Sequence, residues 1–373
     1  MSPTLESITG LMLADLSPAL ADGEARSAVR RLAYRLPAVY WGGFEVRLAP
    51  GNVPVDFHMG IEGPKAAKRI IDADLPQLFP QEAQGWERIE SFLRCWQDPT
   101  TRLHQTISYI VLEFDLGRVG DARSLPAVFW SFPETLQQEP PGEEALHTIK
   151  EAMTLLYGTA PSDGMMQTAA QCLKNRPPAT VPFHAGTRPG EKTMALRLNL
   201  WGFDPAHDES PLSAPLNTTA YDAARLPADV ASAIDTAVLA VDITDRVLPD
   251  IGLECVPRQA TDGGSDWDLL LRKMTAAGLC ESEKMKGLLA WPGIRTPAES
   301  ESRWPEELIF EGLMAEPGAF GLFRRALSHV KISFPTKGRP TAKGYLQYDH
   351  RWEYIKPGAF CRGDFAGKRT GRR

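Results

Sequence analysis

Two acidic side chains, Glu113 and Asp115, have the residue type and spacing that suit proton transfer. They lie two positions apart in the run VLEFDL, where Leu112, Phe114 and Leu116 alternate with them. Successive side chains of a strand point to opposite faces, so both carboxyl groups share one face of an expected strand. A carboxyl group on a buried strand is costly unless it faces a cation, solvent or a working cavity. This pair could serve as general acid or base, and the same pattern also fits a solvent-facing strand.

Basic side chains recur near the C-terminus, in the run HVKISFPTKGRPTAKGYLQYDHRW over residues 329–352. Lys331 alternates with apolar residues on a first expected strand, and Lys343 and Tyr345 share one face of a second. Proline and glycine between the two runs indicate a turn, so we expect a hairpin. If the polar face points into a barrel or cleft, it offers two ammonium groups and a phenol to an anion. If it points outward, it is an ordinary solvated face.

Three further expected strands place charged or polar side chains between apolar ones. Arg197 and Asn199 alternate with leucines in MALRLNLW, Asp242 lies in LAVDITD, and Glu254 lies in GLEC. An ordinary core leaves such faces apolar. The interior is polar if all these faces point inward, and they form surface if they point outward. The period of two allows both arrangements.

Motifs of high specificity are missing from the sequence. The segment GTRPGEKT over 186–193 has its glycines too close for a phosphate loop, and an expected strand follows instead of a helix. Asp242 and Asp245 form a DxxD pair on an expected strand, so the helical acidic site for magnesium-bound diphosphate is missing. The seven histidines show no HxH or HExxH spacing and are expected at surface or hydrogen-bonded positions. We therefore expect no metal site and no cofactor.

Strand pairs and helix pairs alternate along the chain. Expected strands lie within 39–61, 107–118, 126–132, 179–186, 193–203, 238–245, 251–257 and the hairpin 329–352. Expected helices lie at 5–36, 64–77, 82–98, 143–157, 163–174, 227–237, 265–277, 281–291, 304–315 and 317–327. This order predicts an α+β fold with an antiparallel sheet, open or closed into a barrel, and helices packed on its outer face.

The chain of 373 residues is long enough for one large domain or two ordinary ones. We expect a single domain over 1–373. Residues 204–227 are rich in Pro, Ser, Asp and Asn, and they are the loop that would join two halves, 1–203 and 228–361. Residues 362–373 are rich in Lys and Arg and are expected to form a mobile tail.

Composition predicts a globular protein of the cytoplasm. Hydrophobic residues make up 43% and charged residues 24%, as in soluble globular chains. The net charge of −6 disfavours nucleic acid as the main partner. Five cysteines without a CxxC spacing suit a reducing compartment rather than a disulfide framework. The sequence has no apolar run long enough to span a membrane and no signal-peptide pattern at its N-terminus.

The alternation of strand pairs and helix pairs, with the Lys343-x-Tyr345 spacing on a strand, resembles the ABBA-type aromatic prenyltransferases. The resemblance covers the region 107–350. It implies a ten-stranded antiparallel barrel, ringed by helices, in which Lys, Arg and Tyr side chains hold an isoprenoid diphosphate. The chain departs from the family pattern at 126–132 and 251–257, where the Lys-x-Tyr spacing is missing.

The same resemblance implies an activity. That activity is the metal-independent transfer of an isoprenyl group from its diphosphate to an electron-rich acceptor, a small aromatic or a peptide. It assigns diphosphate binding to Lys331, Lys343 and Tyr345 with Arg197 assisting, and acid–base catalysis to Glu113 or Asp115.

A non-catalytic protein explains the missing motifs equally well. It would be a binding or accessory protein that captures a peptide or protein on the edge of its sheet. A polar, closed interior favours the enzyme, whereas a filled apolar core with an open sheet edge favours the binding protein.

Overall fold

The computed structural model describes residues 4–51, 54–116, 125–138, 142–177, 179–205, 226–259, 266–300, 304–316 and 318–354. Most of the expected loop 204–227, the basic segment 362–373 and Cys361 lie outside these residues, so what is expected of them stays a prediction. Within the described ranges, none of the helices has the length and apolar character needed to cross a membrane.

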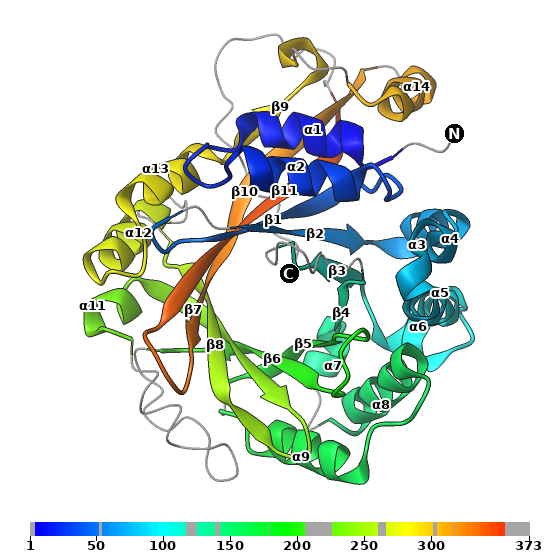
Figure 1. Ribbon diagram of the computed structural model, residues 1–373, viewed down its shortest axis with the longest axis vertical. Helices are drawn as coiled ribbons and strands as arrows, with labels where there is room; N and C mark the ends of the chain where they lie inside the picture. Colours follow the sequence, from blue (N-terminus) through cyan, green and yellow to red (C-terminus); the bar gives the residue numbers. More distant parts are fainter. Residues whose placement is uncertain are drawn as a thin grey trace.

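Ten strands of the described chain form a closed antiparallel barrel (Figure 1). They are β1 (Trp41–Arg47), β2 (Val55–Ile61), β3 (Ile110–Phe114), β4 (Ala127–Ser131), β5 (Val181–Thr187), β6 (Leu196–Phe203), β7 (Ile234–Ile243), β8 (Val247–Pro257), β10 (Ala319–Phe334) and β11 (Thr341–Tyr354). Neighbours pair in the order β1 to β8, then β10 and β11, and β11 pairs back with β1. The short strand β9 (Gly293–Arg295) pairs with β10 outside this ring.

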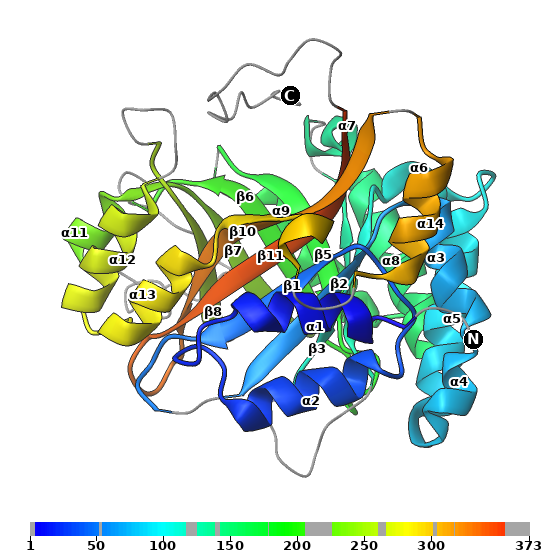
Figure 2. The same ribbon diagram turned by 90° about the horizontal axis from the view of Figure 1, so that it is seen from above.

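Helices surround the barrel on its outside, as the two ribbon views show (Figures 1 and 2). Those before β7 are α1 (Glu6–Asp15), α2 (Gly23–Ala33), α3 (Gly63–Asp72), α4 (Leu75–Leu78), α5 (Ala83–Gln97), α6 (Arg102–Thr106), α7 (Glu134–Gln138), α8 (Glu143–Tyr157), α9 (Asp163–Lys174) and α11 (Ala228–Ala231). Those after β8 are α12 (Trp267–Ala276), α13 (Ser282–Ala290) and α14 (Glu306–Met314). Two short 3-10 helices, η1 (Pro80–Glu82) and η2 (Pro297–Glu299), complete the described elements.

The outward faces of the strands are mainly apolar and pack against these helices. Helix α5 illustrates the contact: the ring of Trp86 lies 6.4 Å from that of Phe114 on β3, and the ring of Phe92 lies 6.1 Å from that of Trp130 on β4. All four side chains are fully buried. Burial of such large apolar surfaces is the main favourable term in folding. The predicted α+β class, with helices on the outer face of the sheet, is confirmed, and the sheet is closed.

Two expected helices are wrong. The segment expected as a helix at 317–327 belongs to β10, in which residues 319–327 pair one by one with β11. Segment 227–237 contains only the four-residue helix α11, and β7 already begins at Ile234. In both cases the hydrogen bonds to a neighbouring strand outweigh the weak local preference for a helix.

The barrel joins strands from both sides of segment 204–227. Strands β1 to β6 precede this segment, the remaining strands follow it, and β6 pairs with β7 across it. The two sequence regions therefore share one sheet. That the chain forms a single domain stays a prediction.

Candidate active site

The inward face of each barrel strand carries the polar side chains that the alternation had placed together. A cavity of about 390 Å³ lies inside the barrel, which is within the size range of small-ligand sites. Residues from all ten strands of the ring line it. The polar members of this lining are His58, Tyr109, Glu113, His184, Asn199, Glu254, Ser328, His329, Lys331, Tyr345 and Gln347.

Three of the residues predicted to carry the chemistry line this cavity: Glu113, Lys331 and Tyr345. The other three lie close to them along the chain. Lys343 and Arg197 are on the same inward faces, two positions from a lining residue, and Asp115 directly follows β3. The barrel therefore gathers all six predicted residues in its interior or at the end of one of its strands.

Lys331 and Glu254 form an ion pair in the cavity wall. They are direct partners across β10 and β8, and Lys331 Nζ lies 3.0 Å from Glu254 Oε1. Their side chains are 10% and 11% exposed. Burial alone would raise the pKa of Glu254, but the charge of Lys331 lowers it to about 2. Glu254 is therefore ionised, and Lys331 balances its charge.

A second cluster centres on Glu45, a residue that the sequence-based prediction did not include. Glu45 accepts hydrogen bonds from Lys343 and Tyr345. Asp56 is its direct partner across β1 and β2, and Asp56 also lies 3.0 Å from Arg47 and 3.8 Å from Lys343. The sequence signal for both acids was the alternation in FEVR and VDFH, the same pattern that singled out Glu113.

The two acids of this cluster differ in their affinity for protons. Burial opposes ionisation of Glu45, but the charge of Lys343 outweighs it and lowers the pKa of Glu45 to about 2. Burial and the negative charge of Glu45 raise the pKa of Asp56 to about 7. Glu45 and Asp56 are adjacent and share Lys343. The pair therefore carries one negative charge in mild acid and two above neutral pH.

Glu113 and Asp115 share one cation, Arg188. The Arg188 guanidinium lies 3.6 Å from Glu113 and bonds Asp115, whose side chain is 42% exposed. Burial, followed by the charge of Glu45, raises the pKa of Glu113, and Arg188 offsets only part of this effect. Arg188 belongs to segment 186–193, which lacked the features of a phosphate loop, and its contribution here is a cation for two carboxylates.

Arg197 makes a two-fold hydrogen bond to Asp242. Arg197 Nε and one terminal nitrogen each lie 2.8 Å from an oxygen of Asp242, its direct partner across β6 and β7. Burial disfavours the charge of Asp242, yet the bond to Arg197 lowers its pKa. Planar paired bonds of this kind are among the stronger ion pairs in proteins.

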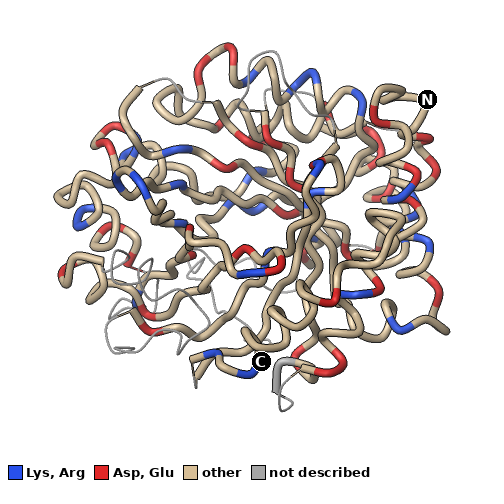
Figure 3. The backbone as a smooth tube through the Cα atoms, turned by 60° about the horizontal axis from the view of Figure 1, so that its bottom comes forward, with Lys and Arg blue, Asp and Glu red and all other residues tan. Residues whose placement is uncertain are grey.

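Every cation of this inward set has a carboxylate partner among the described residues. The carboxylates are Glu45, Asp56, Glu113, Asp115, Asp242 and Glu254, and the cations are Arg47, Arg188, Arg197, Lys331 and Lys343. Along the barrel strands, basic and acidic residues accordingly lie close together (Figure 3). An anion that binds here therefore competes with carboxylates for these cations.

Aromatic side chains form the other part of the cavity wall. Trp41 and Tyr109 meet edge to face with ring centroids 5.4 Å apart, and Phe183 lies 5.6 Å from Trp201. Phe129 lines the same cavity. The negative faces of such rings attract a cation, most strongly where water is excluded. The cavity therefore combines an aromatic wall with a wall of paired charges.

Three histidines line the cavity, which the sequence did not indicate. Burial lowers the pKa of His58 and His184 to about 4, and it also lowers that of His329. These rings are therefore neutral at pH 7. His184 Nε2 lies 2.7 Å from the Tyr109 hydroxyl, as expected of a hydrogen-bonded histidine. The ring of His329 stacks on that of Tyr345 at 4.1 Å.

Four buried polar atoms of the lining have no hydrogen-bond partner among the described residues. They are Trp41 Nε1, His58 Nδ1, Asn199 Oδ1 and His329 Nε2. Buried polar atoms are rarely left unpaired, so their gathering in one cavity marks positions that a polar ligand can occupy. The described residues contain no group of three or more metal-ligating side chains suited to a metal ion.

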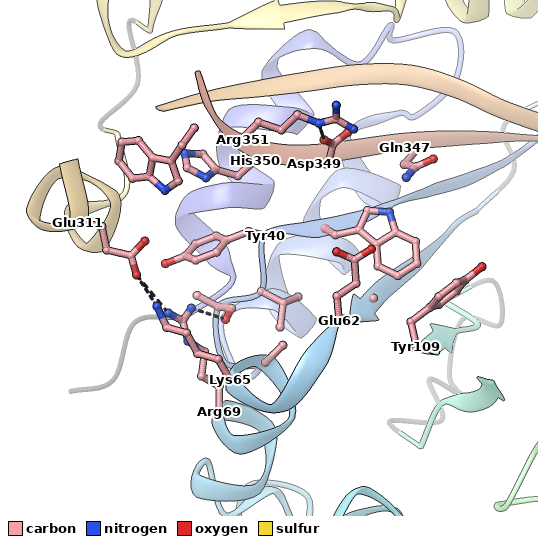
Figure 4. A pocket seen from close by; sticks show the side chains of 16 residues that line it. Tyr40, Glu62, Lys65, Arg69, Tyr109, Glu311, Gln347, Asp349, His350 and Arg351 are labelled. Atoms are coloured by element: carbon pink, nitrogen blue, oxygen red, sulfur yellow. Dashed lines mark hydrogen bonds and ion pairs between the residues drawn. The ribbon is translucent and has the colours of Figure 1, made fainter. Parts of the chain in front are cut away.

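Figure 4 shows a second pocket, of about 620 Å³. The two share Trp41, Tyr109 and Gln347 as lining residues. Charged side chains of both signs line the second pocket, and Lys65 Nζ pairs with Glu311 at 2.8 Å. Because the two pockets share these residues, the second pocket lies beside the cavity inside the barrel, which we call the lumen.

Several solved structures resemble this chain. No family model and no curated protein matches the chain. A 5-dimethylallyltryptophan synthase from Streptomyces coelicolor is 15% identical with a TM-score of 0.49, and it covers 93% of this chain and 98% of its own. A 6-dimethylallyl tryptophan synthase is 12% identical with a TM-score of 0.45, covering 93% and 96%. A 6-dimethylallyltryptophan synthase from Micromonospora olivasterospora, in complex with DMASPP and Trp, is 13% identical with a TM-score of 0.45, covering 93% and 97%.

At these identities and TM-scores, the likenesses carry no conclusion about the activity of this chain. The strand pairing of the chain itself defines its fold. That pairing gives ten antiparallel strands, closed and ringed by helices, in the described residues. This is the architecture that the resemblance to ABBA-type prenyltransferases implied.

Proposed function

We propose that this protein transfers an isoprenyl group from an isoprenoid diphosphate to an electron-rich aromatic acceptor inside the barrel. The observation that supports the proposal most directly is the combination, in one cavity inside the barrel, of an aromatic wall with the Lys331–Glu254 pair. The aromatic wall suits an allylic cation, Lys331 suits the leaving diphosphate, and a carboxylate suits the proton that the acceptor loses.

The proposed reaction has three bond changes. The bond between the allylic carbon and the diphosphate oxygen breaks, and its electron pair leaves with the diphosphate. A carbon of the aromatic acceptor bonds the allylic cation, and the same ring carbon then loses its proton to a carboxylate. In the proposed complex the bound substrates displace water from the cavity, which protects the cation from hydrolysis.

The predicted site residues take these roles. Lys331 and Tyr345 line the cavity and would contact the diphosphate, while Lys343 and Arg197 would assist from two positions further along the same strand faces. Of the two predicted acids, Glu113 lines the cavity, whereas Asp115 lies at the end of β3 with Arg188. We further propose that these cations take the place of a divalent metal.

One observation favours a second candidate, a protein that binds an aromatic ligand without chemistry. The described lumen cations are all paired with carboxylates, so a neutral or cationic ligand binds without breaking an ion pair. The closed ring offers no free strand edge among its described strands, so capture of a peptide on such an edge has no support within the barrel.

The experiment that separates these functions is thermal stability with dimethylallyl, geranyl and farnesyl diphosphates, each with and without EDTA. Ligand at 100 times its Kd stabilises the folded state by about 2.7 kcal/mol. A rise in melting temperature that survives EDTA, together with a prenylated aromatic product by mass spectrometry, supports the transferase. No shift with any diphosphate, but a shift with an aromatic amine or indole, supports the binding protein.

A further inference from the structure

Glu254 differs from the other carboxylate of the cavity wall in how its cation is held. Glu113 faces Arg188, which also bonds Asp115, so two carboxylates hold that guanidinium. Lys331 is bonded to Glu254 at 3.0 Å and lies in the lining of the same cavity. A lysine carries its charge on a flexible stem with rotatable donors. Lys331 can therefore turn from Glu254 to a ligand in the cavity.

The neighbouring strand accommodates the Lys331 stem over a glycine. A Cβ atom at Gly252 would lie 2.9 Å from Lys331 Cε, so the glycine provides the space in which the lysine stem lies. Gly252 is the direct partner of Ser333 across β8 and β10, two positions from the Lys331–Glu254 pair. A side chain at position 252 would force the stem to shift.

We propose, resting on the isoprenyl transfer proposed above, that Glu254, in place of the predicted Glu113, is the catalytic base and that Lys331 activates it by exchanging Glu254 for the diphosphate. When the ammonium group of Lys331 binds the leaving group, Glu254 loses its counter-charge. The acceptor ring then loses its proton to a Glu254 oxygen, and the electron pair of that C–H bond restores the aromatic ring. The proton on Glu254 replaces the charge that Lys331 had supplied.

The surroundings of Glu254 support an increase in basicity when Lys331 leaves. Burial raises the pKa of this carboxyl group, and Lys331 is the first of the charges that lower it. The other titratable groups that face or adjoin Glu254 are His329 on β10, His184 on β5, Tyr109 before β3, Tyr345 on β11 and Cys255 on β8. Burial keeps both histidines neutral at pH 7, so neither ring replaces the charge of Lys331.

The first test titrates Glu254 directly, by carbon NMR of protein labelled at the glutamate carboxyl groups. The Glu254→Gln protein assigns the signal. Adding dimethylallyl S-thiolodiphosphate, a probe whose leaving group departs slowly, should raise the pKa of Glu254 by one unit or more. In Lys331→Met protein the pKa should already be raised, and the probe should not raise it further.

The outcomes of this titration are separable. Binding of the probe with an unchanged Glu254 signal overturns the exchange and leaves the transferase proposal standing. Failure of the probe and of all three isoprenoid diphosphates to bind overturns the transferase proposal, and the exchange falls with it.

The second test uses kinetics of the full chain once a prenylated product has been detected. Glu254→Gln should lower kcat about 100-fold or more with little change in KM for the diphosphate, because a general base contributes about 10² to 10⁴ in rate. Glu254→Asp keeps the charge and should restore part of kcat. Glu353→Gln, an exposed position at the far end of β11, is the matched control. Equal kcat values for Glu254→Gln and the control would exclude Glu254 as the base.

Gly252→Ala provides a variant that keeps both charged groups. Crowding of the Lys331 stem should weaken diphosphate binding several-fold, while the Lys331–Glu254 coupling remains measurable by the same titration. Unchanged diphosphate affinity in this variant would show that the stem does not need to move.

Discussion

Lys331 and Lys343 are direct partners across β10 and β11, yet each ammonium group bonds a different carboxylate. Lys331 bonds Glu254 on β8, and Lys343 bonds Glu45 on β1. Like charges directly opposite each other destabilise a strand pair. The two neighbouring strands supply the counter-charges, so this lysine pair is tolerated because the sheet is closed on both sides.

Removal of Lys331 alone should destabilise the protein, whereas removal of both members of its pair should not. Lys331→Met leaves Glu254 buried without a counter-charge, which costs about 3–5 kcal/mol. The double variant Lys331→Met with Glu254→Leu replaces the pair by apolar groups and should melt close to the unmodified protein. Lys286→Met breaks an exposed pair with Glu283, both side chains being 65% exposed, and should change stability by about 1 kcal/mol or less. If the double variant lost as much stability as the two single variants combined, Lys331 and Glu254 would not be energetically paired.

Diphosphate binding should depend on the lumen lysines and not on surface lysines. Lys331→Ala combined with Glu254→Gln keeps the wall free of an unpaired charge, and it should weaken dimethylallyl diphosphate binding about 10-fold or more, equal to about 1.4 kcal/mol. Lys343→Ala should act in the same direction. Lys337→Ala, in the exposed turn between β10 and β11, serves as the control. Calorimetric Kd values that stay equal across these proteins would remove the lysines from the proposed site.

Protonation of Asp56 should make the protein more stable in mild acid than above neutrality. Its folded pKa of about 7 lies above its ordinary value of 3.8. The contribution is therefore fully present below pH 4 and is lost as the pH rises through 7. The full difference is about 4 kcal/mol or less, because the pKa shift is about three units and each unit corresponds to about 1.4 kcal/mol. Asp56→Asn should flatten the melting temperature between pH 5 and about pH 8.

Asp72→Asn is the control for this titration, because Asp72 lies on α3 with a side chain that is 57% exposed. It should keep the pH profile of the unmodified protein. A profile that persists unchanged in Asp56→Asn would assign the pH dependence to another group.

Glu113 should titrate above the ordinary range of a glutamate. Burial and the charge of Glu45 raise its pKa, and Arg188 compensates only in part. Carbon NMR of labelled glutamate, with the signal assigned by Glu113→Gln, measures this directly. Arg188→Met should raise the pKa of Glu113 further. An ordinary value in the unmodified protein would contradict the effect of burial and of Glu45 on the pKa of Glu113.

The aromatic wall should control the fate of the allylic cation. Trp201→Ala removes a ring from the wall and opens space for water, so the ratio of isoprenyl alcohol to prenylated product should rise about 10-fold. Trp201→Phe should retain most of the original ratio. Tyr354→Ala, at a residue 58% exposed, is the control. An unchanged product ratio in Trp201→Ala would show that this ring does not shield the reaction.

Local alternation was enough to predict which side chains share a strand face. Strict alternation placed Glu113, Arg197, Lys331, Lys343 and Tyr345 opposite apolar neighbours, because a strand has a period of two. Residues of the second cluster, such as Glu45, follow the same rule and could have been found by it. The apolar stripe of α5 was equally readable, since its spacing repeats with the helical turn.

The direction in which those faces point, and the charges that meet, depend on pairing between distant strands. Inward orientation requires β11 to pair with β1, and Lys343 meets Glu45 across a separation of 298 residues. Lys331 and Glu254 are 77 residues apart, and their contact depends on the register of two strands. Register and closure depend on hydrogen bonds between distant segments, whereas a local window of sequence reports only its own period. For the same reason, the helix predicted at 317–327 is wrong: residues 319–327 form a strand because they pair with β11.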